Sequence, residues 1–274
     1  MKLNIISLIS VLCSGLLLSS CSKNEEINLD IPEGKGVLNI QPKAKTDIQI
    51  PVITTRSSEL FDPQDVNTYY VSITGKENRE YETFKALQDE GLPLQLPVGD
   101  YDIISSSFKK ENQKTSEKPY FEGKESFKIE EKQVTNVLVN CTFRSIGVVV
   151  KPSPEFQKLL DDESTSLAYA FEADVYNGEP DAKLSFFQEH MDGESARKQL
   201  TPGYFLDAPK SGKLTVKVRV RLSNTSGWYP ERTYYYDYNG QKADLGQYYT
   251  IILDAGPHVT EGQALKLSVE EDSK

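Results

Sequence analysis

Alternation of apolar and polar residues with a period of two is the feature of this sequence that most limits its fold. From Lys213 to Leu222, every second residue is Leu or Val, and the residues between them are Lys, Thr or Arg. Successive side chains of a strand point to opposite faces of a sheet, so this stretch predicts a strand with one buried and one solvent-facing side. Comparable short segments recur about every ten residues between turn signals. The pattern predicts an all-β fold of antiparallel strands.

The strands fall into two groups, with the division near Arg144. We expect two tandem antiparallel β-sandwich domains of the immunoglobulin or prealbumin-like type, at residues 35–143 and 144–271. The chain is long enough for both to bury a core of their own.

Two local motifs carry specific structural expectations. Ser153 can cap a short helix, because its side-chain oxygen can accept a hydrogen bond from a backbone N–H of the first turn. Pro154 suits the first helical position, where a backbone N–H would have no partner within the helix. Pro97 and Gly99 predict a turn just before Tyr101. The Tyr101 ring can then be buried while its hydroxyl group satisfies a backbone group, as in a tyrosine corner.

The first twenty-one residues resemble the signal peptide of a bacterial lipoprotein. The apolar stretch at residues 3–18 is too short to cross a bilayer as a stop-transfer helix. It ends in the sequence L-S-S-C, which resembles a lipobox, and the last residue of that sequence is Cys21. We therefore expect a lipoprotein signal peptide at residues 1–20, lipidation of Cys21, and a flexible tether over residues 21–34. An ordinary signal peptide that happens to end near a cysteine is the alternative.

The polar residues directly after Cys21 indicate the cellular location of the protein. Ser22 is not the aspartate that marks retention in the inner membrane, and Glu25-Glu26 resembles the export tag of Bacteroidota surface lipoproteins. More than one acyl chain on a residue gives stable membrane attachment. We expect a protein of the outer membrane that is lipid-anchored and exposed on the cell surface.

Charge and cysteine content limit the partners. Removal of residues 1–20, which contain one Lys and no acidic residue, changes the net charge from −10 to −11. An acidic chain repels nucleic acid, so the expected partners are the membrane, through the lipid anchor, and a glycan or a surface protein. Cys13 leaves with the signal peptide and Cys21 is acylated, so Cys141 stands alone in an apolar run and is predicted to be a core residue.

Motifs for catalysis or metal binding are weak. The two histidines, His190 and His258, lie far apart with no ligand at suitable spacing. The acidic runs at residues 161–163 and 237–244 suit a helix end and a hairpin turn better than a calcium loop. We expect no catalytic residues, no metal and no cofactor, and no enzymatic activity. A glycoside hydrolase that uses carboxylates far apart in the sequence is the remote alternative.

Aromatic residues gather near the C-terminal end, where six of the eleven residues from 228 to 238 are Trp or Tyr. Exposed rings stack on sugars and form interface hot spots, although tyrosine is also a good strand former. Basic residues on the polar face of the 213–222 strand can recruit an acidic glycan or protein, or can protect an edge from aggregation. The candidate ligand-binding residues are Trp228, Tyr229, Tyr235, Arg219 and Arg221.

Three motifs, in this order, carry a resemblance to a known family. They are the segment L-x-L-P-V-G-x-Y that begins at Leu94, the P-Y-F-E-G-K of residues 119–124, and the P-G-Y-F of residues 202–205. From about Gly36 to Gly256 the chain resembles a domain-of-unknown-function family of Bacteroidota surface lipoproteins. The resemblance implies a tandem β-sandwich on the cell surface, broadly similar to fimbrial and adhesin-type lipoproteins, with no established chemistry.

These observations predict a cell-surface lipoprotein that acts as a non-enzymatic binding, adhesion or surface-assembly module. The aromatic residues around Trp228 favour an alternative, a glycan-capturing lipoprotein of a polysaccharide-uptake system.

Overall fold

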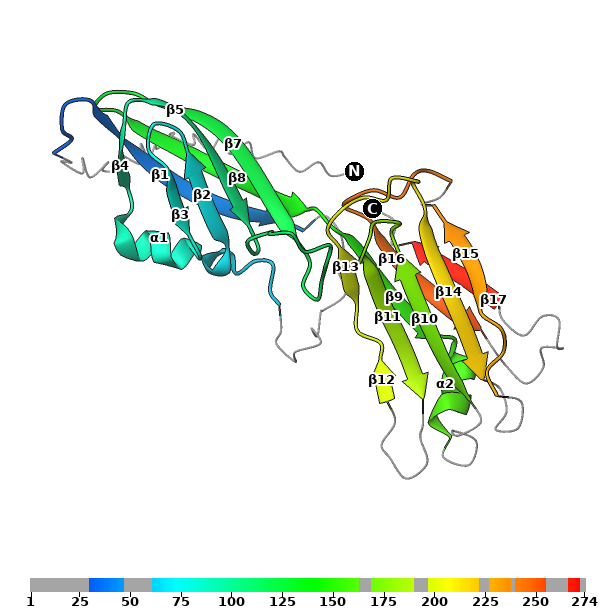
Figure 1. The fold of residues 1–274 in the computed structure, drawn as a ribbon. Coiled ribbons are helices and arrows are strands. Elements are labelled where there is room, and N and C mark those ends of the chain that lie inside the picture. The colour runs from blue at the N-terminus through cyan, green and yellow to red at the C-terminus, as the bar shows by residue number, and fades with distance from the viewer. Residues whose placement is uncertain are drawn as a thin grey trace, which may run out of the picture. The chain divides into compact units, whose positions relative to one another are not determined.

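Three β-sheets account for most of the described chain, and the prediction of a β-rich fold is confirmed (Figure 1). The computed structural model describes residues 30–46, 61–162, 169–189, 197–221, 227–237, 240–254 and 266–271, the last of these by their backbone only. The predicted signal peptide, Cys21 and residues 22–29 of the predicted tether lie outside the described residues. Within the described ranges, no helix is long and apolar enough to cross a membrane.

The first sheet, here called the curled sheet, has the strand order β3-β2-β5-β7-β8-β1-β4. Its strands are β1 (Lys35–Lys45), β2 (Tyr70–Thr74), β3 (Arg79–Tyr81), β4 (Leu94–Pro97), β5 (Gly99–Ser106), β7 (Phe121–Ile129) and β8 (Val134–Phe143). A sandwich of two sheets was expected for this part of the chain. The structure has one sheet there, curled like half a barrel, and a helix packs against its inner face.

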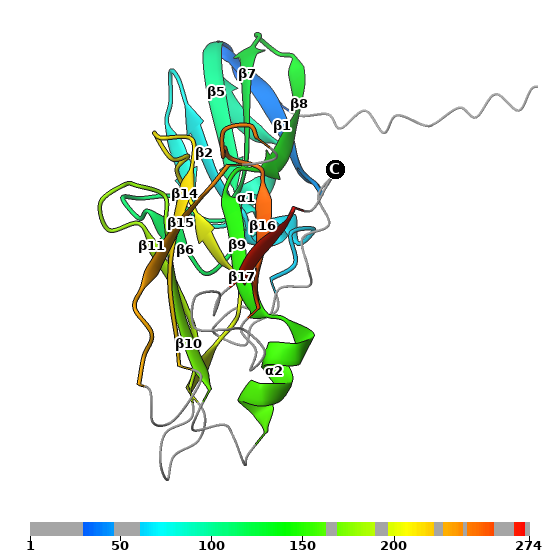
Figure 2. The same ribbon diagram turned by 90° about the vertical axis from the view of Figure 1, so that its right-hand side faces the viewer.

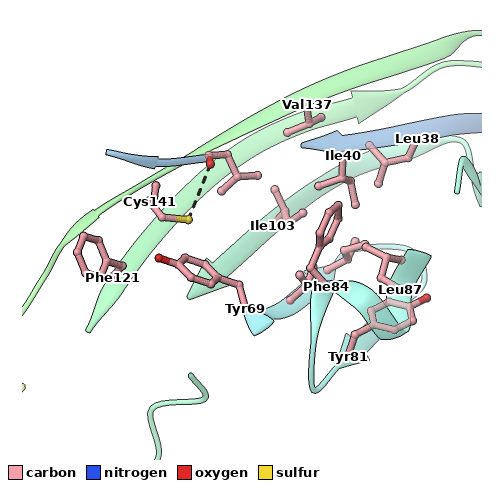
Figure 3. Close-up of a cluster of buried hydrophobic side chains, with 14 of the residues drawn as sticks. Leu38, Ile40, Tyr69, Tyr81, Phe84, Leu87, Ile103, Phe121, Val137 and Cys141 are labelled. Carbon is pink, nitrogen blue, oxygen red and sulfur yellow. Dashed lines mark hydrogen bonds between the residues drawn. The ribbon is translucent and has the colours of Figure 1, made fainter. Parts of the chain in front are cut away.

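Helix α1 (Phe84–Gly91) takes the place of the second sheet, and our sequence analysis missed it. The Thr83 side chain caps this helix by accepting a hydrogen bond from the Ala86 N–H at 3.1 Å. Phe84 and Leu87, one helical turn apart, point into the same core as Leu38 (Figure 3). A threonine cap followed by apolar residues three positions apart is the local signal that could have revealed the helix.

The predicted tyrosine corner is present in the curled sheet. The Tyr101 hydroxyl donates a hydrogen bond to the Pro97 carbonyl at 3.0 Å, and the Tyr101 ring stacks on Phe127 with centroids 5.7 Å apart. A Cβ atom at Gly75 would lie 2.5 Å from the Tyr101 ring, so the strand end at Gly75 must lack a side chain. The motif that carries the family resemblance therefore has a structural role here.

Two strand pairs are parallel, which corrects the expectation of purely antiparallel sheets. β1 pairs with β8 in parallel, and β9 (Ile146–Pro152) pairs in parallel with β16 (Tyr248–Asp254). Parallel neighbours need a long crossover connection, and each pair is separated in sequence by several intervening strands that supply it. This is a property of the topology, which local patterns do not reveal.

The remaining strands form two five-stranded sheets. The central sheet has the order β17-β16-β9-β13-β6, with β6 (Thr115–Ser116), β13 (Gly203–Phe205) and β17 (Lys266–Glu271). The outer sheet has the order β12-β11-β10-β14-β15, with β10 (Ala170–Tyr176), β11 (Lys183–Glu189), β12 (Arg197–Gln199), β14 (Leu214–Arg221) and β15 (Arg232–Tyr236). Valines of β9 and β14 lie in one hydrophobic core, so these two sheets pack face to face.

Helix α2 (Pro154–Asp161) follows β9 directly and begins as predicted (Figure 2). The Ser153 hydroxyl accepts a hydrogen bond from the Phe156 N–H at 3.2 Å, and Pro154 occupies the first helical position. Phe156 and Leu160 are buried in the core between the central and outer sheets. A 3-10 turn at Val66–Thr68 is the other short helical element of the described chain.

The central sheet is buried on both of its faces at the end where β9, β13 and β16 meet. Val149, Tyr204 and Tyr248 belong to the core of the curled sheet, whereas their chain neighbours Phe205 and Tyr249 belong to the core shared with the outer sheet. Neighbouring residues of a strand point to opposite faces, so this sheet separates two cores and contributes to each.

An arm of the chain between β5 and β7 joins the curled sheet to the central sheet. Strand β6 in this arm pairs with β13, and the Leu206 N–H donates to the Lys114 carbonyl at 3.0 Å. The Asp207 carboxylate accepts from Lys110 at 3.0 Å and from Lys114 at 3.3 Å. Partial burial alone would raise the pKa of Asp207, but the two ammonium groups hold that pKa below its usual value. The arm is therefore tied down by backbone and charged contacts.

Two valines of β8 provide a matched test of the curled-sheet core. Val139 is fully buried, whereas Val134 is 53% exposed on the same strand. We expect Val139→Ala to lower the free energy of unfolding by about 2 kcal/mol, through lost apolar burial and the cavity left behind. Val134→Ala should change it by about 0.5 kcal/mol or less. Urea unfolding followed by circular dichroism measures both, and equal losses would contradict the assignment of the core.

Candidate ligand-binding face

The solvent face of the outer sheet carries most of the candidate residues. Along β14, Val216, Val218 and Val220 are buried in the core, and the residues between them point to the opposite side. Arg219 and Arg221 therefore lie on the solvent face, as the period of two predicts. Cross-strand pairing places Glu172 of β10 beside Arg219 on that face.

Trp228 lies against both arginines. The centre of its ring is 4.7 Å from the Arg219 guanidinium carbon and 5.5 Å from that of Arg221. The next residue, Tyr229, donates its backbone N–H to the Val220 carbonyl at 2.9 Å, which fixes this segment to the end of β14. Cation–π contacts at partly exposed sites contribute about 0.5–1 kcal/mol each. The indole is thus held in one place, half-buried, on the sheet.

Both arginines are also paired with carboxylates. The Arg219 Nε and Nη2 atoms donate to Glu172 at 2.7 and 2.5 Å, and Arg221 Nη1 donates to Glu189 at 3.3 Å. A guanidinium that already has a carboxylate partner is a weaker attractor for an external anion than a free one. The stripe of basic residues seen in the sequence is therefore neutralised by acids from β10 and β11.

The tyrosines of β15 divide between the two sides of the sheet. Tyr234 and Tyr236 pack toward the core, their rings stacked with centroids 6.5 Å apart, and burial raises the pKa of Tyr236 to about 12. Tyr235 points the other way and is 67% exposed. Tyr229 packs against the core as well. Of the five candidates, Trp228, Tyr235, Arg219 and Arg221 share the solvent face, and Tyr229 supports it from within.

Two aromatic residues of the same face were missed in the sequence analysis. The Tyr176 ring on β10 lies 5.6 Å from Lys217 Nζ, and the Phe187 ring on β11 lies 5.1 Å from the Arg197 guanidinium carbon. Both are half-buried. Alternation along β10 and β11 could have placed them on the polar face, but which sheet faces solvent was not evident from the sequence.

Asp161 and Asp237, two of the acidic positions considered for calcium, have other partners. Asp161 accepts hydrogen bonds from Gln157 and Gln188, and Asp237 accepts from the Gly240 N–H at 3.1 Å and pairs with Lys213. His190 and His258 lie outside the described residues. Among the residues that the structure describes, no three His, Cys, Asp or Glu side chains are grouped to hold a metal ion. The expectation of no metal and no cofactor stays a prediction.

Cys141 is a buried thiol within the core of the curled sheet. Its S–H contacts the Ser105 carbonyl at 3.4 Å. Burial raises the pKa of the thiol to about 11, so it stays protonated at neutral pH and is a poor nucleophile. The prediction of a core role for this residue is confirmed.

The curled sheet has a shallow hollow of about 630 Å³ over β5 and β7. The Asp102 carboxylate on its rim accepts a hydrogen bond from the Ser126 hydroxyl at 2.5 Å. Tyr101 and Phe127, which also line the hollow, stack on each other. This hollow therefore offers fewer free ring faces than the outer sheet does.

The chain belongs to the family described as Domain of unknown function (DUF4493), whose sequence profile matches residues 34–273. Motif residues that carried the resemblance, among them Tyr101, Tyr120 and Tyr204, are buried and serve the fold. No match is found among curated proteins.

Solved structures from Bacteroides and Parabacteroides species resemble the chain at 10–12% sequence identity. A protein of Bacteroides eggerthii, provisionally named a cell adhesion protein, has 11% identity and a TM-score of 0.47, covering 88% of this chain and 97% of its own. A provisionally named polysaccharide-binding protein of Bacteroides thetaiotaomicron has 12% identity and a TM-score of 0.43, with coverages of 86% and 96%. A fimbrial assembly protein of Parabacteroides distasonis has 12% identity and a TM-score of 0.40, with coverages of 88% and 96%. Similarity at this level carries no argument about a ligand.

The contacts around Trp228 can be tested by fluorescence, because it is the only tryptophan in the sequence. We expect Arg219→Gln combined with Arg221→Gln to release the ring, so that quenching by acrylamide rises roughly twofold and the emission shifts to longer wavelength. Arg232→Gln, an exposed arginine on the neighbouring strand, is the matched control and should change neither signal. An unchanged spectrum in the double variant would show that the arginines do not hold the ring.

Proposed function

We propose that this protein is a lipid-anchored, outward-facing protein of the outer membrane that acts as a non-enzymatic binding or adhesion module, alone or within a surface assembly. The leader sequence that ends at Cys21 supports the anchor. In this proposal, residues 1–20 are a signal peptide, 21–34 form the acylated tether, and 35–143 and 144–271 are two β-rich domains, of which only the second keeps the expected sandwich of two sheets.

The observation that carries the proposal is the solvent face of the outer sheet. Trp228, Phe187 and Tyr176 are each held by cations, and Tyr235 is exposed beside them on the next strand. Rings whose position is already fixed lose little entropy on binding, which favours their use as contact points. The same face carries hydrogen-bonding side chains between the rings, as binding surfaces do.

A second candidate function is glycan capture for a polysaccharide-uptake system. The indole of Trp228 beside planar guanidinium and carboxylate groups favours it, because flat rings pack on the apolar faces of sugars and the polar groups bond to hydroxyls. In both candidates the protein binds its ligand without changing it chemically.

Binding by this face is tested with an array of glycans, mucins and outer-membrane proteins probed with the purified full-length protein. We expect Trp228→Ala to weaken a specific hit about tenfold or more, the loss typical of a hot-spot aromatic residue. Leu138→Ala removes an apolar side chain that is 46% exposed on the curled sheet and should leave the hit unchanged. If both variants bind like the wild type, the ligand sits elsewhere. If folded wild-type protein gives no hit at all, the proposed binding function fails.

The anchor is tested by replacing each cysteine of the leader. We expect Cys21→Ala to abolish incorporation of labelled palmitate and to release the protein from the membrane fraction, because no thiol remains for acylation. Cys13→Ala, eight residues earlier in the same leader, should keep both properties. Retention of the label in the Cys21→Ala variant would contradict a lipid anchor at this residue.

A further inference from the structure

We propose that the solvent face of the outer sheet binds an uncharged polysaccharide and that it discriminates against acidic ones. The inference rests on the proposed binding function and names its ligand class. It differs from what the sequence alone suggests, because the basic residues of β14 taken by themselves favour an anionic ligand.

The first step concerns the arginines and lysines of the face. Each cation on β14 has a carboxylate from a neighbouring segment: Arg219 has Glu172, Arg221 has Glu189, and Lys217 has Glu231 at 3.6 Å. On β11, Lys183 pairs with Asp174 at 3.2 Å. A polyanion would have to break these pairs or bind beside their carboxylates. Arg197 of β12 also lies on this face, opposite Glu189 in the pairing register. The paired cations of β14 and β11 therefore do not favour an acidic ligand.

The second step concerns the chain as a whole. Its net charge is −10, so the surrounding field repels a polyanion as it approaches. An uncharged chain does not experience this repulsion. Desolvation of an uncharged sugar also costs less than desolvation of a carboxylate or sulfate group.

The third step concerns the arrangement of the rings. Phe187 on β11, Glu172 on β10 and Arg219 on β14 lie in one row across the sheet, and Trp228 lies against Arg219. Adjacent strands are about 4.8 Å apart, so β11 and β14 are separated by roughly 10 Å.

Four residues further along β10 a second row runs across the sheet in the same direction. Tyr176 pairs with Thr215, and Thr215 pairs with Tyr235. In the first row one ring lies on β11 and the Trp228 ring lies over Arg219, and in the second row two rings flank Thr215. This is the pattern that an extended chain with alternating apolar faces and hydroxyl edges would contact.

The fourth step concerns hydrogen bonding. A carboxylate can accept about four hydrogen bonds and a guanidinium can donate five, so the Glu172–Arg219 pair keeps unused capacity on its solvent side. Hydroxyl groups act as donor and acceptor at once and can use both partners of such a pair. The pair thus fits hydroxyl-rich ligands better than ligands that offer acceptors only.

The test titrates the full-length protein with size-matched polysaccharides and follows binding by calorimetry. The uncharged set is a glucan, a mannan and a galactan, and the acidic set is polygalacturonate and hyaluronan. We expect at least one uncharged polymer to bind, with Kd changing less than twofold between 50 and 500 mM NaCl, and neither acidic polymer to bind detectably. Trp228→Ala and Phe187→Ala should each weaken binding about tenfold.

A gain-of-function variant makes the test sharper. Glu172→Gln together with Glu189→Gln frees both arginines while keeping side-chain size, so it should create salt-sensitive binding to polygalacturonate that the wild type lacks. Tight, salt-sensitive binding of an acidic polymer by the wild type would overturn the inference. So would binding of a mucin protein or surface protein with no uncharged polysaccharide bound, although the proposed binding function would then stand.

Discussion

The structure depends on the part of the central sheet that is buried on both faces. Gly147 of β9 lies between Tyr204 of β13 and Tyr248 of β16 in the pairing register, and both rings point into the core of the curled sheet. A Cβ atom at Gly147 would lie 2.2 Å from the Tyr248 ring, so only glycine leaves room for this arrangement. Full burial of one large apolar side chain stabilises a fold by about 1.5–3 kcal/mol. Cys141, the cysteine of the described chain, is a free thiol, so burial of apolar side chains stabilises this part of the fold without a disulfide.

Burial on both faces also explains why the candidate ligand-binding face lies on the outer sheet. Where β9, β13 and β16 meet, the central sheet has no free face, since one side packs against the curled sheet and the other against β10, β11 and β14. The outer sheet is packed on one side only, so its alternate residues must meet solvent. Because the core holds the strands in place, it also fixes the positions of the side chains on the solvent face. The positions of Trp228 and Tyr235 thus follow indirectly from packing around β9.

Local structural motifs, such as a helix start or a tyrosine corner, could be predicted from the sequence because one short segment determines each of them. Ser153 and Pro154 begin α2 because the cap and the proline act within one turn, and Tyr101 closes its corner on a residue four positions earlier. Features that depend on contacts between distant segments could not be predicted. Helix α1 replaces a second sheet because Phe84 and Leu87 fit the inside of a curled sheet, and nothing near residue 84 encodes that curvature. The parallel pairing of β1 with β8 is of the same kind.

The chemistry of the candidate site shows the same limit. The sequence places Arg219 and Arg221 on one face of a strand, but their partners Glu172 and Glu189 lie 47 and 32 residues away. The strand order places these two glutamates beside the two arginines, so the basic residues of β14 form ion pairs. The Trp228 ring lies over Arg219 on the same face. Surface ion pairs of this kind contribute little stability, with a median of about 0–1 kcal/mol. Their main physical consequence here is that they fix the orientation of planar polar groups and cancel their charge. In the proposed function, this face selects ligands by shape and hydrogen bonding, and net charge contributes mainly by keeping polyanions away.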